Sequence, residues 1–223
     1  MRSIKNYFSI LVLICSLSIS KHSSSQTLAD FFQKEKKVYW LGIDFTAAKM
    51  IGPMAEAFGA FDKSEQSLRV KYFPGWNNLV LDEARKFNLN KALRAATIVY
   101  DIQMITDLNA SDTAKIKEQI VLSDPVSLQA HVKKYKYNRD SGLATVFIVD
   151  SFNKLEGKAI IYFVLFRAQD KQILLQQKIT SHPSGLSMRN YWGNAIYSAI
   201  KKIQYNWYKR WKKAYKKQNH AGS

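Results

Sequence analysis

The spacing of hydrophobic and polar positions changes along the chain, and each spacing predicts a different element. Residues 37–46, KVYWLGIDFT, are rich in aromatic and β-branched side chains, which is typical of a β-strand. A second strand is predicted at residues 97–108, TIVYDIQMITDL. Between these two segments the pattern is helical but interrupted by glycine and proline. Asn77 or Asn78 is expected to cap the clearer helix there.

The second half of the chain predicts three β-strands and then a long helix. The strands, at residues 143–152, 158–167 and 172–180, are joined by short turns and are expected to form an antiparallel meander. The last helix spans residues 189–215, because apolar side chains recur there at spacings of three and four. These side chains are Trp192, Ile196, Ile200, Ile203, Trp207 and Trp211.

Helical segments separate the first three predicted strands. The second of these segments is expected to start at Asp124-Pro125 and to bury Leu128 and Val132 on one face. The full order is therefore β-α-β-α-β-β-β-α. Strands joined through a helix tend to pair in parallel, and strands joined by a short turn pair antiparallel. The sequence thus predicts an α+β domain with a mixed β-sheet and a long C-terminal helix.

This order of elements resembles that of small periplasmic domains found in the curli-export channel subunit and in outer-membrane activators of peptidoglycan synthases. The stretch Arg189-Asn190-Tyr191-Trp192 also looks like one found in uncharacterised exported proteins. Such domains are commonly assembly or accessory parts without enzymatic activity. The resemblance therefore implies a non-catalytic role for this chain.

The N-terminal segment has the composition of a secretory signal peptide. Arg2 and Lys5 precede an apolar run at residues 7–19, which a short polar tract follows. The run has about 13 residues, whereas a membrane-spanning helix needs about 20. Cleavage is expected near Ser25 or Gln26. The protein is therefore expected to be exported and to act in the periplasm, at the envelope or outside the cell.

The predicted organisation is a signal peptide at residues 1–26, a single α+β domain at residues 27–217 and a disordered tail at residues 218–223. The only cysteine, Cys15, belongs to the signal peptide. The mature domain is therefore expected to contain neither a disulfide nor a thiolate site. A chain of roughly 200 residues can bury enough apolar surface to fold without them.

Two groups of polar residues are expected to meet at one edge of the sheet. Asp44 and Asp150 interrupt apolar strands near the carboxyl edge, where open α/β sheets place ligands. Ser187, Arg189 and Asn190 start the last helix and are expected to reach the same edge. A cation in the first turn of a helix opposes the helix dipole. Arg189 is therefore expected either to pair with a buried Asp44 or Asp150, or to hold an anionic ligand with Ser187 and Asn190.

Motifs for catalysis, metal binding or cofactor binding are not found in the sequence. His131 and His182 have no partner at a metal-ligand spacing, so surface or capping roles are expected for both. The chain has no G-x-S-x-G nucleophile elbow and no glycine-rich phosphate loop. These observations favour a non-catalytic protein, with no cofactor and no metal, over an enzyme.

The C-terminal end is strongly basic. The formal net charge of the chain is +17, and residues 171–223 hold eleven basic residues and no acidic one. The last helix interleaves its cations with tryptophan and tyrosine, which is typical of a helix that lies at a lipid interface. The residues expected to form this surface are Lys201, Lys202, Trp207, Lys209, Arg210, Trp211, Lys212, Lys213, Lys216 and Lys217.

Two functions are therefore considered. The first is an exported accessory or binding module of the cell envelope, whose basic aromatic helix binds an anionic membrane surface or an envelope protein. Nucleic acid would attract the same composition, but export argues against it. The second is a small-ligand-binding or hydrolytic domain that uses the acidic residues and Arg189 at the sheet edge. If the aromatic stripe only packs on the sheet, the basic face is simply a solvated surface.

Overall fold

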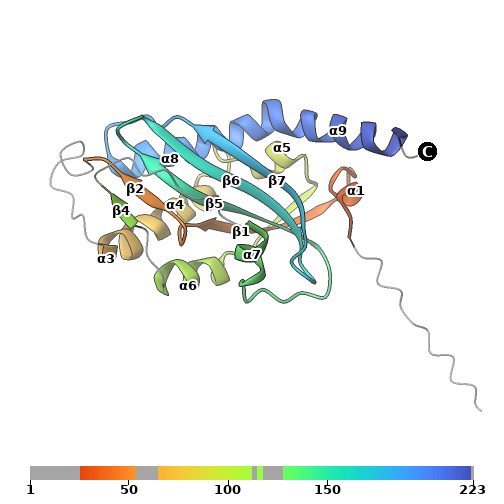
Figure 1. Cartoon of the computed structure of the whole chain (residues 1–223), viewed down its shortest axis with the longest axis horizontal. Helices are drawn as coiled ribbons and strands as arrows, with labels where there is room; N and C mark the ends of the chain where they lie inside the picture. Colours follow the sequence, from red (N-terminus) through yellow and green to blue (C-terminus); the bar gives the residue numbers. More distant parts are fainter. Residues whose placement is uncertain (1–25, 54–64, 112–114, 118–127, 222–223) are drawn as a thin grey trace, which may run out of the picture.

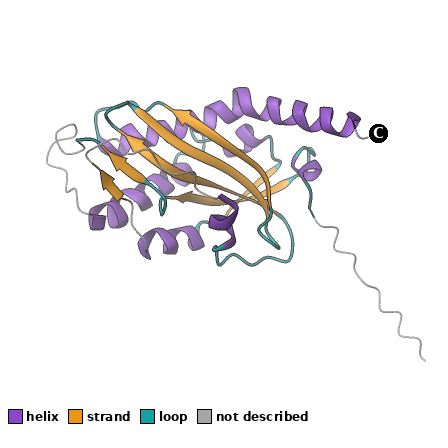
Figure 2. Ribbon diagram, in the orientation of Figure 1, coloured by secondary structure: helices purple, strands orange, loops and turns teal. Residues whose placement is uncertain are grey.

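A mixed β-sheet lies at the centre of the structure, with helices on both of its faces (Figures 1 and 2). The computed structural model describes residues 26–53, 65–111, 115–117 and 128–221. The sheet of this part of the chain has seven strands. The strands are β1 (Lys37–Asp44), β2 (Lys49–Ile51), β3 (Thr97–Tyr100), β4 (Lys115–Lys117), β5 (Leu143–Asn153), β6 (Lys158–Arg167) and β7 (Ile173–Ser181).

Strand β5 organises this sheet. Its first half pairs in parallel with β1 and its last three residues pair in parallel with β2, while β6 pairs with its other edge antiparallel. Strand β3 extends the sheet beyond β1, β4 extends it beyond β2, and β7 extends it beyond β6. All eleven residues of β5 are buried, as expected for a strand that is covered on both faces. The predicted α+β class, with a mixed sheet and a long C-terminal helix, is confirmed.

Helices of unequal number cover the two faces. On one face α4, α5, α8 and α9 pack against the larger apolar cluster, which includes Trp40, Trp76, Phe147 and Trp192. On the other face α6 and α7 pack against a smaller cluster that includes Leu41. The helical elements are α1 (Leu28–Phe31), α3 (Glu65–Ser67), η1 (Leu68–Tyr72), α4 (Phe73–Asp82), α5 (Leu89–Leu93), α6 (Gln103–Ser111), α7 (Leu128–Lys133), α8 (Met188–Lys202), η2 (Ile203–Trp207) and α9 (Tyr208–Ala221), where η1 and η2 are π-helical.

The strand predicted at residues 37–46 breaks after Asp44 and resumes as β2. Strand β2 was not predicted, because glycine and proline follow it and it has only three residues, of which Met50 and Ile51 are apolar. Side-chain amides from both faces hold the break. The Asn77 amide oxygen accepts a hydrogen bond from Ile43 N (2.7 Å). The Asn109 amide oxygen accepts one from Phe45 N (2.8 Å). Both amide nitrogens donate to the Ile43 carbonyl.

These amides replace strand pairing where it ends. Strand β3 pairs with β1 only as far as Trp40, so the backbone polar groups of Ile43 would otherwise be buried without partners. The prediction that Asn77 or Asn78 caps a helix was wrong. Helix α4 begins at Phe73, which puts Asn77 in its second turn, facing the sheet.

The segment predicted as a strand at residues 97–108 contains two elements. Strand β3 ends at Tyr100, and α6 starts at Gln103. The buried residues of α6 are Ile105 and Asn109, four apart, which is a helical spacing. The β-branched residues of the segment hid this spacing.

The meander and the helix before it follow the prediction closely. Strand β6 has the predicted bounds, and β5 and β7 differ from theirs by one residue at the ends. Leu128 and Val132 of α7 are buried, as expected. The start signal predicted at Asp124-Pro125 lies outside the described residues, and so does nearly all of the predicted signal peptide.

The C-terminal helix contains one π-helical turn, η2, and the sequence explains its position. Buried apolar side chains recur at steps of three or four up to Ile203, but the next buried apolar side chain is that of Tyr208, a step of five. A turn with one extra residue absorbs that step and keeps Tyr208 and Trp211 on the face that packs against the body. Helix α9 runs to Ala221, so the tail predicted as disordered at residues 218–223 is helical for its first four residues.

Candidate functional site

The Asp44 carboxylate is completely buried and accepts hydrogen bonds from three side chains. Oδ1 accepts from the Thr46 backbone N–H (2.8 Å) and from the Thr46 hydroxyl (2.7 Å). Oδ2 accepts from the Tyr135 hydroxyl (2.5 Å) and lies 2.7 Å from His131 Nε2. Because a carboxylate can only accept, His131 carries its proton on Nε2. Asp44 thereby links the end of β1 to α7 and to Tyr135, just beyond that helix.

Ionisation of this cluster follows from its contacts. Burial raises the pKa of Asp44, but the hydrogen bond and charge of His131, together with Tyr135 and Thr46, outweigh burial and leave it below its ordinary value. Burial and the neighbouring Asp44 charge raise the pKa of Tyr135 well above its ordinary value. Asp44 is therefore ionised and Tyr135 is neutral at pH 7.

An Asp–His pair can orient a general base, but in the part of the chain that the structure describes no free hydroxyl or thiol contacts His131. The Thr46 hydroxyl lies 3.5 Å from His131 Nε2, and it already donates to Asp44. Among the described residues, no group of three His, Cys, Asp or Glu side chains is arranged to hold a metal ion. The geometry of the cluster is that of a buried structural link between β1 and α7.

Sequence reasoning missed the role of His131, for which a surface or capping position was expected. The side chain of His131 is only 18% exposed and contacts Asp44. A signal was present in the sequence. The apolar face of α7 that carries Leu128 and Val132 also passes through His131 and Tyr135 at helical spacing. A buried strand aspartate needs donors, and these two residues can supply them.

The prediction that Arg189 pairs with Asp44 or Asp150 in the interior was wrong. Arg189 is exposed, and it forms no ion pair with any described residue. They cannot pair because Arg189 and the two aspartates lie on opposite faces of the sheet. Helix α8 packs on the face of Trp40 and Trp192. Asp44 bonds to Tyr135 on the opposite face. Burial and the nearby charge of Asp150 raise the pKa of Tyr162, which packs against the same cluster as Tyr135.

The other two predicted ligand residues lie beside Arg189. The Ser187 hydroxyl caps α8 by accepting from Asn190 N (3.3 Å), and both residues are exposed. The Arg189 carbonyl accepts from the Trp76 indole N–H (3.0 Å). The structure therefore brings Ser187, Arg189 and Asn190 together at the start of α8 and separates them from both aspartates.

Because only the Arg189 backbone is engaged, Arg189→Ala is expected to leave stability almost unchanged. The expected change in the free energy of unfolding is within about 0.5 kcal/mol, as for other surface substitutions. Thermal unfolding of the variant beside the wild type measures this. A fall of several degrees in melting temperature would mean that the guanidinium has a buried partner after all.

The aromatic side chains of α9 pack against the body. The Trp211 ring stacks on Phe163 with centroids 5.0 Å apart, and its indole N–H donates to Gln177 (3.3 Å). The Tyr208 ring lies 5.7 Å from Phe31, in α1. Tyr208 and Trp211 are 2% and 7% exposed, so neither can reach into a bilayer.

The cations of α9 lie on its other face. Among the described residues none of them forms an ion pair with an acidic side chain, and no acid follows Asp170 in the sequence. Figure 1 shows α9 running along the edge of the molecule and ending beyond α1. We call this surface the basic face of α9. Its exposed members are Lys209, Arg210, Lys213, Lys216 and Lys217.

The remaining residues of the predicted surface are less accessible. Lys202 Nζ donates to the Thr180 carbonyl (2.6 Å), and Lys201 lies over the Tyr197 ring. Trp207 and Lys212 are half-buried. The structure therefore divides the predicted surface into an aromatic part that packs inward and a cationic part that faces solvent.

A buried lysine lies below this helix. Lys36 is 6% exposed, and its ammonium donates to Gln33 O (3.2 Å), Arg94 O (2.7 Å) and the Tyr208 hydroxyl (3.1 Å). Burial, followed by the charges of Lys212 and Arg94, lowers the pKa of Lys36 to about 8. Burial is the larger cause, and the two neighbouring cations add to it.

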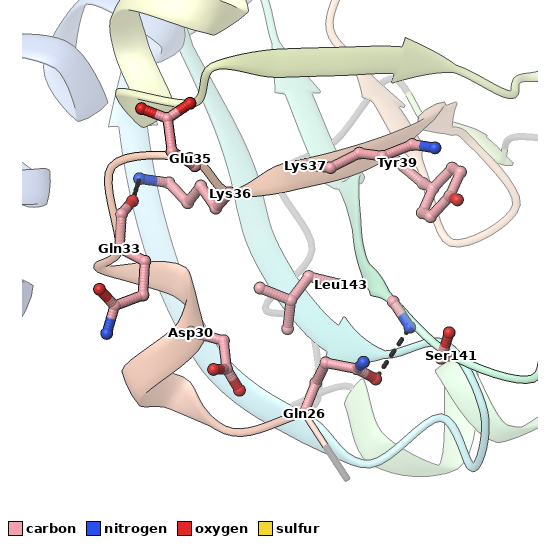
Figure 3. Close-up of a pocket in the computed structure, with 10 residues that line it drawn as sticks. Gln26, Asp30, Gln33, Glu35, Lys36, Lys37, Tyr39, Ser141 and Leu143 are labelled. Carbon is pink, nitrogen blue, oxygen red and sulfur yellow. Dashed lines mark hydrogen bonds between the residues drawn. The ribbon is translucent and has the colours of Figure 1, made fainter. Parts of the chain in front are cut away.

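Figure 3 shows a pocket beside Lys36, between α1 and the start of β1. Its volume is about 500 Å³. Asp30 and Glu35 line it together with Lys36 and Lys37, so its charges are mixed. Gln26, where signal cleavage is predicted, closes one end: its side-chain oxygen accepts from Gly142 N (2.8 Å). Gln26 is thus bonded to the folded body of the protein.

Comparisons with known proteins give no match, either to a protein-family model or to a curated protein. In the described part of the chain, no helix has both the length and the apolar character needed to cross a membrane.

Proposed function

We propose that this protein is an exported, non-catalytic accessory module of the cell envelope that binds an anionic membrane surface through the basic face of α9. The observation that carries the proposal is the two-sided character of this helix. Its aromatic residues anchor it to the body, and its cations face solvent without acidic partners. The resemblance in element order to small periplasmic accessory domains also supports this role.

The lysines of α9 repel one another, and this repulsion favours the binding of an anionic surface. Lys209 and Lys213, like Lys213 and Lys217, are four residues apart, and like charges at this spacing destabilise a helix by a few tenths of a kcal/mol per pair. The helix dipole offsets part of this cost near the C-terminus. An anionic surface offsets the rest. Binding is expected to occur by adsorption, because Tyr208 and Trp211 are already buried.

The alternative, a ligand-binding or hydrolytic domain at the sheet edge, has weaker support. It required Arg189 to converge with Asp44 or Asp150. Arg189 lies on the other side of the sheet, and the Asp44 oxygens are occupied by Thr46, His131 and Tyr135.

Neutralising the outer end of α9 is expected to weaken binding to anionic vesicles strongly. The variant Lys213→Gln/Lys216→Gln/Lys217→Gln removes three exposed charges. Each contributes about 1 kcal/mol near an anionic membrane, so the affinity should fall by roughly two orders of magnitude at low salt. Vesicle flotation with phosphatidylglycerol measures this, and the difference should vanish at high salt.

Substitutions suit this test better than truncation. Removal of α9 would expose the rings that Tyr208 and Trp211 cover. A matched control is Lys34→Gln/Lys134→Gln/Lys178→Gln, which removes the same charge from exposed positions on other elements. An equal loss in the control would show that binding depends on net charge alone and contradict a role for α9. If wild-type protein does not float but retains an acidic envelope protein, the partner is a protein instead.

A further inference from the structure

A second cationic feature lies where α5 meets the C-terminal helix. Five side chains line a pocket of about 420 Å³ there, and none of them is acidic. Lys91 comes from helix α5, and Arg94 is the C-cap of that helix. Gln204 and Tyr205 come from η2, and Lys209 comes from α9. We call it the α5–α9 pocket. Its three cations set it apart from the pocket of Figure 3, which has mixed charges.

The backbone and a ring contact hold Arg94 in place. Arg94 ends α5 in the left-handed conformation (φ 49°), which residues other than glycine rarely adopt. Its guanidinium lies over the Tyr208 ring, 4.7 Å from the centroid, and its carbonyl accepts from Lys36. A guanidinium stacked on a ring is fixed in direction and keeps its N–H groups free for a planar or tetrahedral anion.

The π-helical turn brings an amide into the same pocket. Gln204 is 8% exposed and lines the pocket, and its amide atoms are not among the buried polar atoms that lack a partner in the described residues, so they are open to solvent. Its N–H groups can therefore donate to an anion in the pocket. Such turns recur at functional sites. The step of five that aligns Tyr208 with the core thus also puts Gln204 beside Arg94.

The electrostatic surroundings are positive. Lys36 lies next to Arg94, and its pKa is lowered to about 8 by burial and by the charges of Lys212 and Arg94. The described residues contain no acidic side chain paired with Lys91, Arg94 or Lys209. An anion in the pocket would relieve this repulsion.

We propose that the α5–α9 pocket binds the phosphate group of an anionic ligand. Arg94 and Lys91 contact the phosphate from α5 and Lys209 from α9, the Gln204 amide donates to it, and the exposed Tyr205 ring borders the organic part. The proposal deepens the proposed function, on which it rests for the source of the ligand, because a phosphate held here lies beside the basic face of α9.

Calorimetric titration with inorganic phosphate and with glycerol phosphate tests the pocket. The main variant is Arg94→Gly, since glycine favours the left-handed conformation and keeps the carbonyl that Lys36 needs. Loss of a charge-assisted hydrogen bond should weaken both ligands roughly tenfold or more. Gln204→Ala should weaken them several-fold. The control Lys178→Ala removes an exposed cation from β7 and should change neither affinity.

The outcomes separate the pocket from the basic face of α9. The pocket proposal is overturned if wild type and Arg94→Gly bind phosphate equally well, or if neither binds it. It is also overturned if Arg189→Ala loses phosphate affinity and Arg94→Gly does not. Phosphate binding that depends on Arg94, in a protein that does not float on anionic vesicles, supports the pocket and overturns the membrane proposal. If Arg94→Gly also weakens flotation, the source is a lipid headgroup. If it weakens only the soluble ligands, the source is a free phosphate ester.

Discussion

Asp44→Ala is expected to lower the free energy of unfolding by about 3 kcal/mol at neutral pH. The substitution leaves the Tyr135 hydroxyl buried without its acceptor and removes the partner of His131, and breaking a buried pair from one side typically costs this much. Chemical denaturation of the variant and the wild type measures the difference.

The effect of Asp44→Ala should depend on pH. The pKa of Asp44 in the folded protein is below its unfolded value of about 4. The carboxylate therefore contributes stability above that value, and the contribution is lost as the pH falls through the lowered pKa. The gap between variant and wild type should shrink in acid.

Asp101 provides the matched control for Asp44. It follows the neighbouring strand β3 and pairs with Arg139 (2.8 Å), but both side chains are partly exposed. Asp101→Ala is expected to cost less than about 1 kcal/mol, as for surface ion pairs. Equal effects of the two substitutions would contradict a special role for the buried cluster.

Asn77→Ala is expected to cost about 3 kcal/mol. The Asn77 amide is 3% exposed and makes three hydrogen bonds, to Ile43 N, Ile43 O and Phe73 O. Its removal leaves the Ile43 N–H buried without an acceptor, while Asn109 still donates to the Ile43 carbonyl. Equilibrium unfolding in urea gives the value.

The neighbouring Asn78 is exposed on the same helix and has the same propensity. Asn78→Ala should therefore change stability by less than about 0.5 kcal/mol. A small effect of Asn77→Ala, similar to that of Asn78→Ala, would show that water satisfies the strand break.

The predictable part of the fold is the part in which one pattern dominates. Strand β6 is apolar almost throughout and sits between tight turns, so its bounds follow from the sequence. Strand β2 has three residues, and its pairing with β5 depends on contacts about 100 residues away that no local pattern records. Asn77 failed for the same reason. From the sequence alone, an asparagine near a helix start is read as a cap for that helix. The partners of Asn77 are instead the backbone groups of Ile43, where strand β1 breaks.

The candidate site shows the same division. The cationic composition of the last helix was readable, but which of its faces turns outward depends on the five-residue step at Ile203. The position of Asp44 on its strand could be predicted. Its partners could not, because they come from a helix that packs on the face opposite α8. Arg189 lies at the start of the last helix, as predicted, but that helix packs on the face of the sheet opposite Asp44.

The central position of β5 has a consequence for how the protein assembles. Strands β1, β2, β3 and β4 all precede it in the chain, yet β5 is the strand that joins β1 to β2 and both to the meander. During synthesis from the N-terminus, the first 142 residues lack the element that unites them. Stable folding must therefore wait until β5 and β6 emerge, and non-local pairing of this kind is slow. This delay fits the export proposed above, because a chain can pass a narrow translocation channel only while it is unfolded.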